Sequence, residues 1–344
     1  MTNETHDQNK QADQARQVVA TQAGATGKTD QAEVTAKAAQ TAPVAQAAPA
    51  AQDAQADPTA QVAQAAQIGQ ARQTAQSASA IQSTDRDDFH PSHYPLLTFP
   101  DEAWQWFIDA CADLEIPVDD SRRAIVEAIY SHLVGVNAWL NLTRITAPAD
   151  YLKFHVFDSL TVLNLVAAFT QPGDTIVDLG SGGGYPGLPL MTWLPERHWV
   201  LVDSRAKKAA FLKEAVKLTP CVTAEAFAFR GREAASACPA LHHRCQIVVA
   251  RAVGQADELL IDAEALLDLN GVLILLKGQS YAGDEQHRFH HALGRHGFSL
   301  MEEQTIALDE TDPDRWVVTA IKSEQRPHST TKAKNKPKRQ SKNR

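Results

Sequence analysis

The stretch I176-V-D-L-G-S-G-G-G-Y-P-G-L-P-L190 decides the fold of this 344-residue chain. A short apolar run carries an acidic residue near its end, Asp178, and four glycines follow before the prolines Pro186 and Pro189. Glycines permit a tight turn and let bare backbone approach a ligand closely. The stretch therefore predicts a buried strand, a ligand-binding loop and then a helix. We expect Pro186 to preset a rigid turn and Pro189 to lie in the first helical turn, where its missing N–H costs little.

The residues around this stretch alternate between short apolar runs and helical patterns. Such alternation, with nearly continuous apolar strands, is typical of a parallel sheet covered by helices on both faces. Strands are predicted at 175–179, 199–203, 222–229, 246–250, 272–277 and 316–321, and helices at 205–217, 257–267 and 284–294. The predicted fold class is therefore α/β, with a doubly wound, mostly parallel, Rossmann-like sheet.

The chain before the sheet is predicted to be helical. Between Pro100 and Phe169 apolar residues recur at spacings of three and four, and no strand pattern interrupts them. One helix is expected to begin after Pro100 with Asp101 near its N-cap, and two more are expected over 122–134 and 149–169. Four parts follow from these patterns: an Ala/Gln-rich disordered tail over 1–88, a helical cap over 89–170, an α/β domain over 171–322, and a basic disordered tail over 323–344.

Composition supports the two tails. Residues 1–88 contain almost no Leu, Phe, Trp or Tyr, so they can bury too little apolar surface to offset the entropy of ordering. The net charge of -8 hides a segregated distribution, because residues 326–344 carry eight Lys or Arg and no acid. A block of this kind is usually a solvated tail, but it is also what an electrostatic contact with nucleic-acid phosphates requires.

Several classes of protein are not indicated. The N-terminus lacks the basic start and apolar core of a signal peptide, and the longest apolar runs are too short to span a bilayer. The four cysteines form no C-x-x-C pair, and the clustered histidines at 242–243 and 287–291 lack the partners of a metal site. We therefore expect a cytoplasmic protein without a metal or a membrane contact.

The glycine loop fits two classes of cofactor. Gly182, Gly184 and Gly187 have the G-x-G-x-x-G spacing of a dinucleotide site. In a dinucleotide site, however, this motif follows the strand directly, whereas here other residues lie between the strand and the motif, and two prolines crowd the turn. An acid followed by G-x-G-x-G, here Asp178 and then Gly180, Gly182 and Gly184, resembles the loop of S-adenosylmethionine-dependent methyltransferases. That cofactor has no pyrophosphate, so the loop would pass against its amino-acid and ribose portions.

Polar residues follow the next strands at the edge where ligands bind in such sheets. Asp203 ends the second strand, where a carboxylate can accept the ribose hydroxyls or cap the following helix. The turn R230-G-R-E233 follows the third strand and would face the adenine. Arg251 follows the fourth strand and suits a cofactor carboxylate, a phosphate or the acceptor edge of a base.

Missing motifs narrow the reaction. The chain has no Asn/Asp-Pro-Pro-aromatic motif for methylation of an amino group, and its Pro220-Cys221 pair precedes the third strand, where a thiolate could not attack a pyrimidine. Guanine N7 already presents a lone pair and needs no general base, so positioning would suffice. The pattern is compatible with N7 methylation.

Together these residues resemble the ribosomal RNA small subunit methyltransferase G family, also called GidB, over residues 100–322. The resemblance is carried by these motifs: N141-L-T143, H155-x-x-D-S-L160, D178-L-G-S-G-G-G-Y-P-G-L-P-L190, L201-V-D-S204, G231-R-E233, A250-R-A252 and L276-K-G278. The Y-P-G-L-P continuation is the specific part. The resemblance implies that 171–322 is the methyltransferase domain and that the enzyme methylates N7 of a guanine in the 530-loop region of 16S rRNA.

The resemblance also implies roles for individual residues. S-adenosylmethionine would contact Gly180, Gly182, Gly184, Tyr185, Asp203, Arg232, Glu233 and Arg251. Candidates for substrate binding are Asn141, Thr143, Asp158, Ser159 and Lys277, and candidates for a catalytic role are Arg251 and His155. The implied partner is 16S rRNA or the small ribosomal subunit. The alternative is a non-catalytic methyltransferase fold that binds RNA and assists ribosome assembly.

Overall fold

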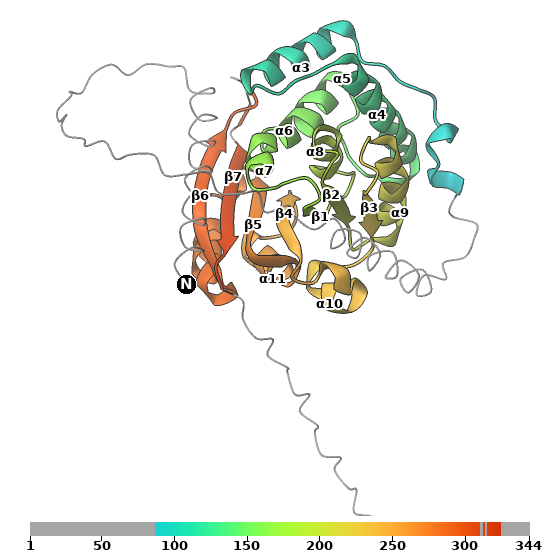
Figure 1. Ribbon diagram of the computed structural model, residues 1–344. Helices are drawn as coiled ribbons and strands as arrows, with labels where there is room; N and C mark the ends of the chain where they lie inside the picture. The colour runs from blue at the N-terminus through green and yellow to red at the C-terminus, as the bar shows by residue number, and fades with distance from the viewer. Residues whose placement is uncertain (1–86, 310–311, 314, 325–344) are drawn as a thin grey trace, which may run out of the picture.

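The computed structural model describes residues 87–309, 312–313 and 315–324 (Figure 1). The two predicted tails, 1–88 and 323–344, lie almost wholly outside the described residues. All four cysteines lie within the described residues, and each is a buried free thiol. Among the described residues no helix has the length and apolar character needed to cross a membrane.

A seven-stranded sheet forms the centre of the molecule, in the order β3-β2-β1-β4-β5-β7-β6 (Figure 1). The neighbours from β3 to β5 pair in parallel, whereas β7 runs antiparallel to both β5 and β6. The strands are β1 Thr175–Leu179, β2 His198–Val202, β3 Glu225–Phe227, β4 Cys245–Arg251, β5 Leu267–Lys277, β6 Phe298–Ile306 and β7 Arg315–Lys322. The predicted doubly wound fold class is confirmed. Its strand order reverses between β1 and β4, which opens a crevice at their carboxyl ends.

The strand predictions succeed where a strand is buried on both sides. The strand β1 has the predicted bounds, and every one of its residues is buried. In contrast, β3 is shorter than the predicted 222–229, and β6 was not predicted at all. Because β6 is an edge strand with mostly half-exposed, polar side chains, it lacks the apolar run that identified the others.

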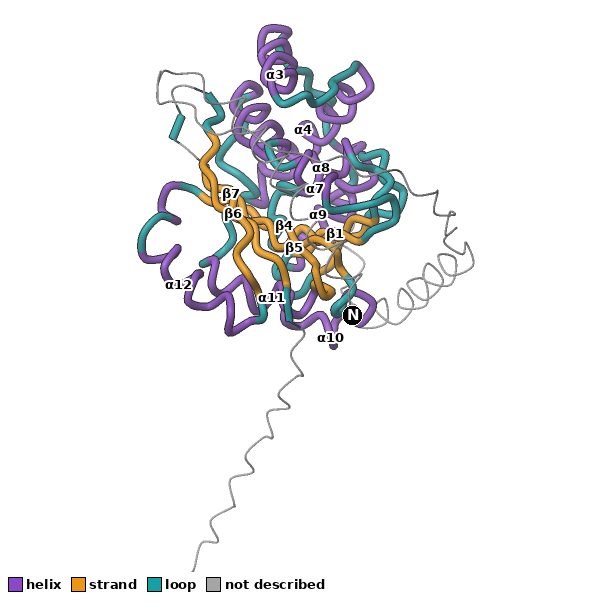
Figure 2. The backbone as a smooth tube through the Cα atoms, turned by 60° about the vertical axis from the view of Figure 1, so that its left-hand side comes forward, coloured by secondary structure: helices purple, strands orange, loops and turns teal. Residues whose placement is uncertain are grey.

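Helices cover both faces of the sheet, as Figure 2 shows. Alternate residues of each strand supply two separate cores, since successive side chains point to opposite faces: Ile176 belongs to one apolar cluster and Val177 to the other. The helices of the sheet domain are α8 Gly187–Trp193, α9 Ala206–Ala215, α10 Ala234–Ala237, α11 Ala256–Leu266 and α12 Asp284–Leu293. Short 3₁₀ turns occur at Asp87–Phe89, Pro91–His93, Val216–Leu218, Gly231–Glu233, Pro239–Leu241, Gln279–Tyr281 and Gly294–His296.

The cap contains two long helices and one interrupted helical run. The long helices are α3 Asp101–Asp113 and α4 Asp120–Leu140. Asp101 is the first residue of α3 rather than its cap, and Pro100 holds the cap position. The predicted helix over 149–169 is broken into α5 Pro148–Tyr151, a π-helical segment Leu152–Phe157, α6 Asp158–Leu160 and α7 Leu163–Ala168. Apolar spacing does not reveal a π turn, because the change of pitch is confined to one turn.

The cap and one face of the sheet share a single apolar core. Leu133 of α4 and Leu152 of the π-helical segment belong to the same cluster as Trp199 and Ile274 of the sheet. Gly183 of the glycine loop also lies against the cap, since a Cβ added there would lie 3.3 Å from Leu133 Cδ1. Packing of this kind makes the cap a wall of the sheet domain rather than a separate unit.

We therefore expect the cap and the sheet to unfold in one thermal transition. Leu133→Ala, at a position with no exposed surface, should lower the whole transition and cost about 2–5 kcal/mol. Leu96→Ala, where the side chain is 67% exposed, serves as the control and should change little. Scanning calorimetry checks this, with agreement of calorimetric and van't Hoff enthalpies as the criterion. Two resolved transitions, with only one lowered by Leu133→Ala, would contradict the shared core.

Candidate active site

The glycine loop leaves the carboxyl end of β1 with three glycines in left-handed conformations. Their φ values are 76° at Gly180, 59° at Gly182 and 98° at Gly184. At Gly184 the conformation requires glycine, and a Cβ there would also lie only 2.1 Å from Leu188 Cδ1. A Cβ on Gly182 would meet nothing nearer than Lys208 Nζ at 3.6 Å. The loop is thus packed tightly at its base and bare at Gly182.

A buried carboxylate ties this loop to the helix that follows it. Asp178 has no exposed surface, and its Oδ2 accepts a hydrogen bond of 2.8 Å from Gly187 N. Burial raises the pKa of this carboxyl to about 6, and its Oδ1 has no hydrogen-bond partner among the described residues. Pro189 lies in the first turn of α8, as predicted, and Pro186 holds the N-cap position of that helix.

Asp203, directly after β2, connects the same loop to α9. Its Oδ2 accepts from Gly182 N at 3.1 Å and its Oδ1 accepts from Arg205 N at 2.8 Å. The carboxylate therefore organises the turn before α9, but it does not cap that helix as the sequence suggested, because Arg205 holds the N-cap position. It also lies beside the bare glycine, and the ribose contact expected of Asp203 stays a prediction.

The turn after β3 is held by its own contacts. Arg232 Nε lies 2.7 Å from Asp262 Oδ1 on α11, and Glu233 Oε2 accepts from Arg230 N at 3.1 Å. The ion pair with Asp262 directs the Arg232 guanidinium toward α11. The adenine contacts expected of Arg232 and Glu233 stay predictions.

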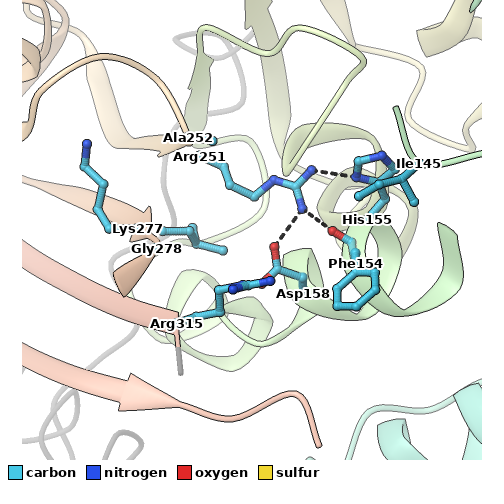
Figure 3. Close-up of a pocket in the computed structure, with 10 residues that line it drawn as sticks. Ile145, Phe154, His155, Asp158, Arg251, Ala252, Lys277, Gly278 and Arg315 are labelled. Atoms are coloured by element: carbon cyan, nitrogen blue, oxygen red, sulfur yellow. Dashed lines mark hydrogen bonds and ion pairs between the residues drawn. The ribbon is translucent and has the colours of Figure 1, made fainter. Parts of the chain in front are cut away.

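Arg251, the last residue of β4, connects the sheet to the cap (Figure 3). Its Nη1 donates to Phe154 O at 2.8 Å and to Asp158 Oδ2 at 2.7 Å, and its Nη2 lies 2.9 Å from His155 Nδ1. The guanidinium carbon also lies 5.1 Å from the ring centroid of Tyr185 in the glycine loop. Arg251 thus contacts both the cap and the loop.

A cavity of 460 Å³ opens beside this cluster. Its walls come from the cap and from the carboxyl ends of β4 and β5 with the start of β7: Ile145, Phe154, His155, Asp158, Arg251, Ala252, Leu276, Lys277, Gly278 and Arg315. Arg315 Nε lies 3.8 Å from Asp158 Oδ1, so arginines flank this carboxylate on two sides. The volume lies within the range of small-ligand pockets.

His155 is a buried, neutral ring between the cap and the loop. It stacks on Tyr185 with 4.4 Å between ring centroids and 9° between planes, and the Tyr185 hydroxyl donates to Tyr151 Oη at 2.8 Å. Burial, and then the charge of Arg251, lowers the pKa of His155 to about 3. The ring is therefore uncharged near neutral pH and carries a single proton.

The other residues predicted to bind the substrate differ from one another in their contacts and exposure. Thr143 Oγ1 lies 2.8 Å from His155 Nε2, whereas Asn141 ends α4 in a left-handed conformation and is exposed. Ser159 has no exposed surface and donates to His155 O at 2.5 Å. Lys277 borders the cavity, but its ammonium lies 2.7 Å from Glu285 Oε1 and its side chain extends away from Arg251 (Figure 3).

Two residues that the sequence did not single out also shape the site. Arg315 begins β7, which is antiparallel to its neighbours and so brings its first residue to the carboxyl edge of β5. Asn137 Oδ1 accepts from Leu142 N at 2.6 Å and from Thr143 N at 2.9 Å, which builds the turn that carries Thr143. Neither lies within the motifs of the glycine-loop region, so no local signal marks it.

Among the described residues, no group of three or more His, Cys, Asp or Glu side chains is arranged to hold a metal.

Comparisons with known proteins identify the family of this chain. A sequence model of the family described as "rRNA small subunit methyltransferase G" (GidB) matches residues 123–306. Curated proteins named ribosomal RNA small subunit methyltransferase G are similar to the chain. The one from Lachnoclostridium phytofermentans is 29% identical over 231 residues, which are 67% of this chain and 94% of that protein. The one from Gloeobacter violaceus is 33% identical over 168 residues, which are 48% of this chain and 65% of that protein.

The contact between Gly187 and Asp178 predicts a position that admits no side chain. A Cβ on Gly187 would lie 2.6 Å from Asp178 Oδ2, so Gly187→Ala should displace the buried carboxylate and cost roughly 1–3 kcal/mol. The matched control is Gly294→Ala, where φ is -63° and an added Cβ would have no non-neighbouring atom within 4 Å. That change should be neutral or stabilise by up to about 1 kcal/mol. Urea unfolding measures both, and equal effects of the two changes would refute the assignment.

Proposed function

Since the chain belongs to the rRNA small subunit methyltransferase G family, we propose that it transfers a methyl group from S-adenosylmethionine to N7 of a guanine in the 530-loop region of 16S rRNA. The observation that carries this proposal is that two features of the site lie side by side. A bare glycine loop at the carboxyl end of β1 lies next to an arginine-bordered cavity at the ends of β4 and β5, with Arg251 in contact with the loop and in the wall of the cavity.

The residues of the loop fit S-adenosylmethionine. The bare backbone at Gly182 admits a close approach, and the Asp203 carboxylate beside it suits the ribose hydroxyls. Asp178 adds a buried negative charge at the base of the loop, and its Oδ1 has no hydrogen-bond partner in the part of the chain that the structure describes; such a charge favours a cationic ligand. When bound, this cofactor supplies an activated methyl group on a sulfonium.

The cavity is suited to a base that presents acceptors. Arg251 and Arg315 supply donors, and a guanine presents N7 and O6 as acceptors on one edge. The apolar walls, which include Phe154 and Ile145, would exclude water from an unstacked base. Because Arg251 also lies over Tyr185 of the loop, a base in the cavity would lie next to the methyl donor.

The chemistry of the cavity supports N7 rather than an amino group. His155 is neutral and its Nδ1 is occupied by Arg251, and Asp158 is paired with the same guanidinium. Neither group is available to remove a proton from a substrate. Guanine N7 has a lone pair in the ring plane and loses no proton on methylation, so a site that only positions its reactants is sufficient.

The direct test is a modification map of small-subunit rRNA from cells with and without this protein. We expect mass spectrometry to find one N7-methylguanine in the 530-loop region of the wild type and unmodified guanine in the deletion strain. Expression of the wild-type chain should restore the modification, whereas Arg251→Ala should not. An unchanged map in the deletion strain would overturn the proposed reaction and favour a non-catalytic role in ribosome assembly.

Calorimetry tests the cofactor separately. We expect the purified chain to bind S-adenosylmethionine, and Asp203→Ala to weaken binding roughly 10- to 100-fold through loss of charge-assisted hydrogen bonds. Asp113→Ala removes an exposed carboxylate at the end of α3 and should leave the affinity unchanged. Absence of heat with the wild-type chain, or equal effects of the two substitutions, would contradict the assigned site.

A further inference from the structure

Arg251 is held by the cap in a defined orientation. Of its five N–H groups, three donate to cap residues: two from Nη1 to Phe154 O and Asp158, and one from Nη2 to His155 Nδ1. The Nε–H and the other Nη2–H make no hydrogen bond to a residue that the structure describes. With the side chain 13% exposed and in the cavity wall, these two donors remain for a ligand.

The contact with Arg251 determines the tautomer of His155. Arginine only donates, so Nδ1 of His155 must accept and the ring proton must lie on Nε2. The Nε2–H then donates to Thr143 Oγ1 at 2.8 Å. Because the ring is also stacked on Tyr185, His155 has one orientation and one tautomer in this structure.

The π-helical segment makes this arrangement possible. Asp158 N donates to Lys153 O, five residues back, instead of to Phe154 O as in an α-helix. Phe154 O therefore accepts from Arg251. Phe154 O, the His155 ring and the Asp158 carboxylate converge on one guanidinium, as Figure 3 shows.

Thr143 is itself fixed by the turn that ends α4. Asn137 Oδ1 accepts from Thr143 N at 2.9 Å, and Thr143 Oγ1 accepts from Ile145 N at 3.0 Å. The hydroxyl oxygen is thus presented to His155 by a rigid turn. A chain of contacts runs from this turn through His155 to Arg251, which retains two donors for a ligand.

We propose that Thr143 and His155 are positioning residues for Arg251: Thr143 accepts from Nε2–H and holds the His155 ring in place, and the Nδ1 of that ring, with Asp158, orients the guanidinium toward the substrate cavity. This inference rests on the proposed methyl transfer and deepens it. It replaces the expectation of direct substrate contact by Thr143 and Asp158, and of a catalytic role for His155, with a role through Arg251.

A pair of variants at His155 separates the acceptor from the stacking ring. His155→Phe keeps a ring against Tyr185 but has no acceptor for Arg251, whereas His155→Asn keeps an acceptor near the position of Nδ1 and loses the ring. We expect His155→Phe to lower kcat for rRNA methylation roughly 10- to 100-fold and His155→Asn to retain more activity than Phe. The reverse order would assign His155 to stacking and overturn the proposal.

A second pair at Thr143 tests the hydroxyl. Thr143→Val should lower kcat, and Thr143→Ser, which retains the acceptor oxygen, should restore it. The melting midpoint and the affinity for S-adenosylmethionine should stay close to those of the wild type in both Thr143 variants, because this side chain contacts His155 and not the cofactor loop. Loss of kcat in parallel with melting midpoint would indicate a merely structural role.

Nitrogen-15 NMR of the His155 ring provides a readout that is independent of methyl transfer. The proposal requires protonated Nε2 and unprotonated Nδ1 from about pH 5 to about pH 8, and the loss of the Nε2–H hydrogen bond should shift the Nε2 resonance in Thr143→Val. An Nδ1–H tautomer, or a ring that titrates in this range, would overturn the positioning network. Confirmation of the tautomer in a chain that methylates no RNA would instead refute the proposed function and leave the geometry standing.

Discussion

The buried ion pair between Arg251 and Asp158 is the interaction on which the site depends. The two side chains are 13% and 8% exposed, so their charges are largely removed from water and require each other. Loss of one partner from such a pair typically costs about 3–5 kcal/mol, because the other charge remains buried. The pair joins the end of a central strand to the cap, and the wall of the cavity, the orientation of His155 and the position of Tyr185 follow from that connection.

The ion pair gives a defined geometry to a contact that the shared apolar core alone would leave unspecific. Leu133, Leu152 and Trp199 would hold the cap on the sheet by apolar contact alone, and apolar contact is non-directional. The hydrogen bonds from Nη1 and Nη2 instead specify which turn of the cap meets β4. The π-helical segment is the local adjustment that lets a helix present a carbonyl, a ring nitrogen and a carboxylate to one fork of donors.

Sequence reasoning predicted the fold and the loop because their signals are local. The apolar run of β1, the glycines after it and the proline in the first turn of α8 lie within one short stretch. Contacts between residues far apart in the chain have no such local signal. Arg251 and Asp158 are 93 residues apart, so the sequence assigned Asp158 to substrate binding and did not pair it with Arg251. Arg315 was not predicted as a site residue because its strand, β7, runs antiparallel to β5. The strand β6 was not predicted because an edge strand needs little apolar surface.

The charge balance of the cavity indicates what it can hold. Asp158 is the only carboxylate among the lining residues that the structure describes, and two arginines flank it. Lys277 adds no free charge, because Glu285 neutralises it at 2.7 Å. The wall therefore carries a net positive charge in a largely apolar setting, where interactions between charges are stronger than in water. A cationic substrate would be repelled, whereas the acceptor edge of a base, or a phosphate beside it, would be attracted. A site with this charge preference can both select its ligand and position it.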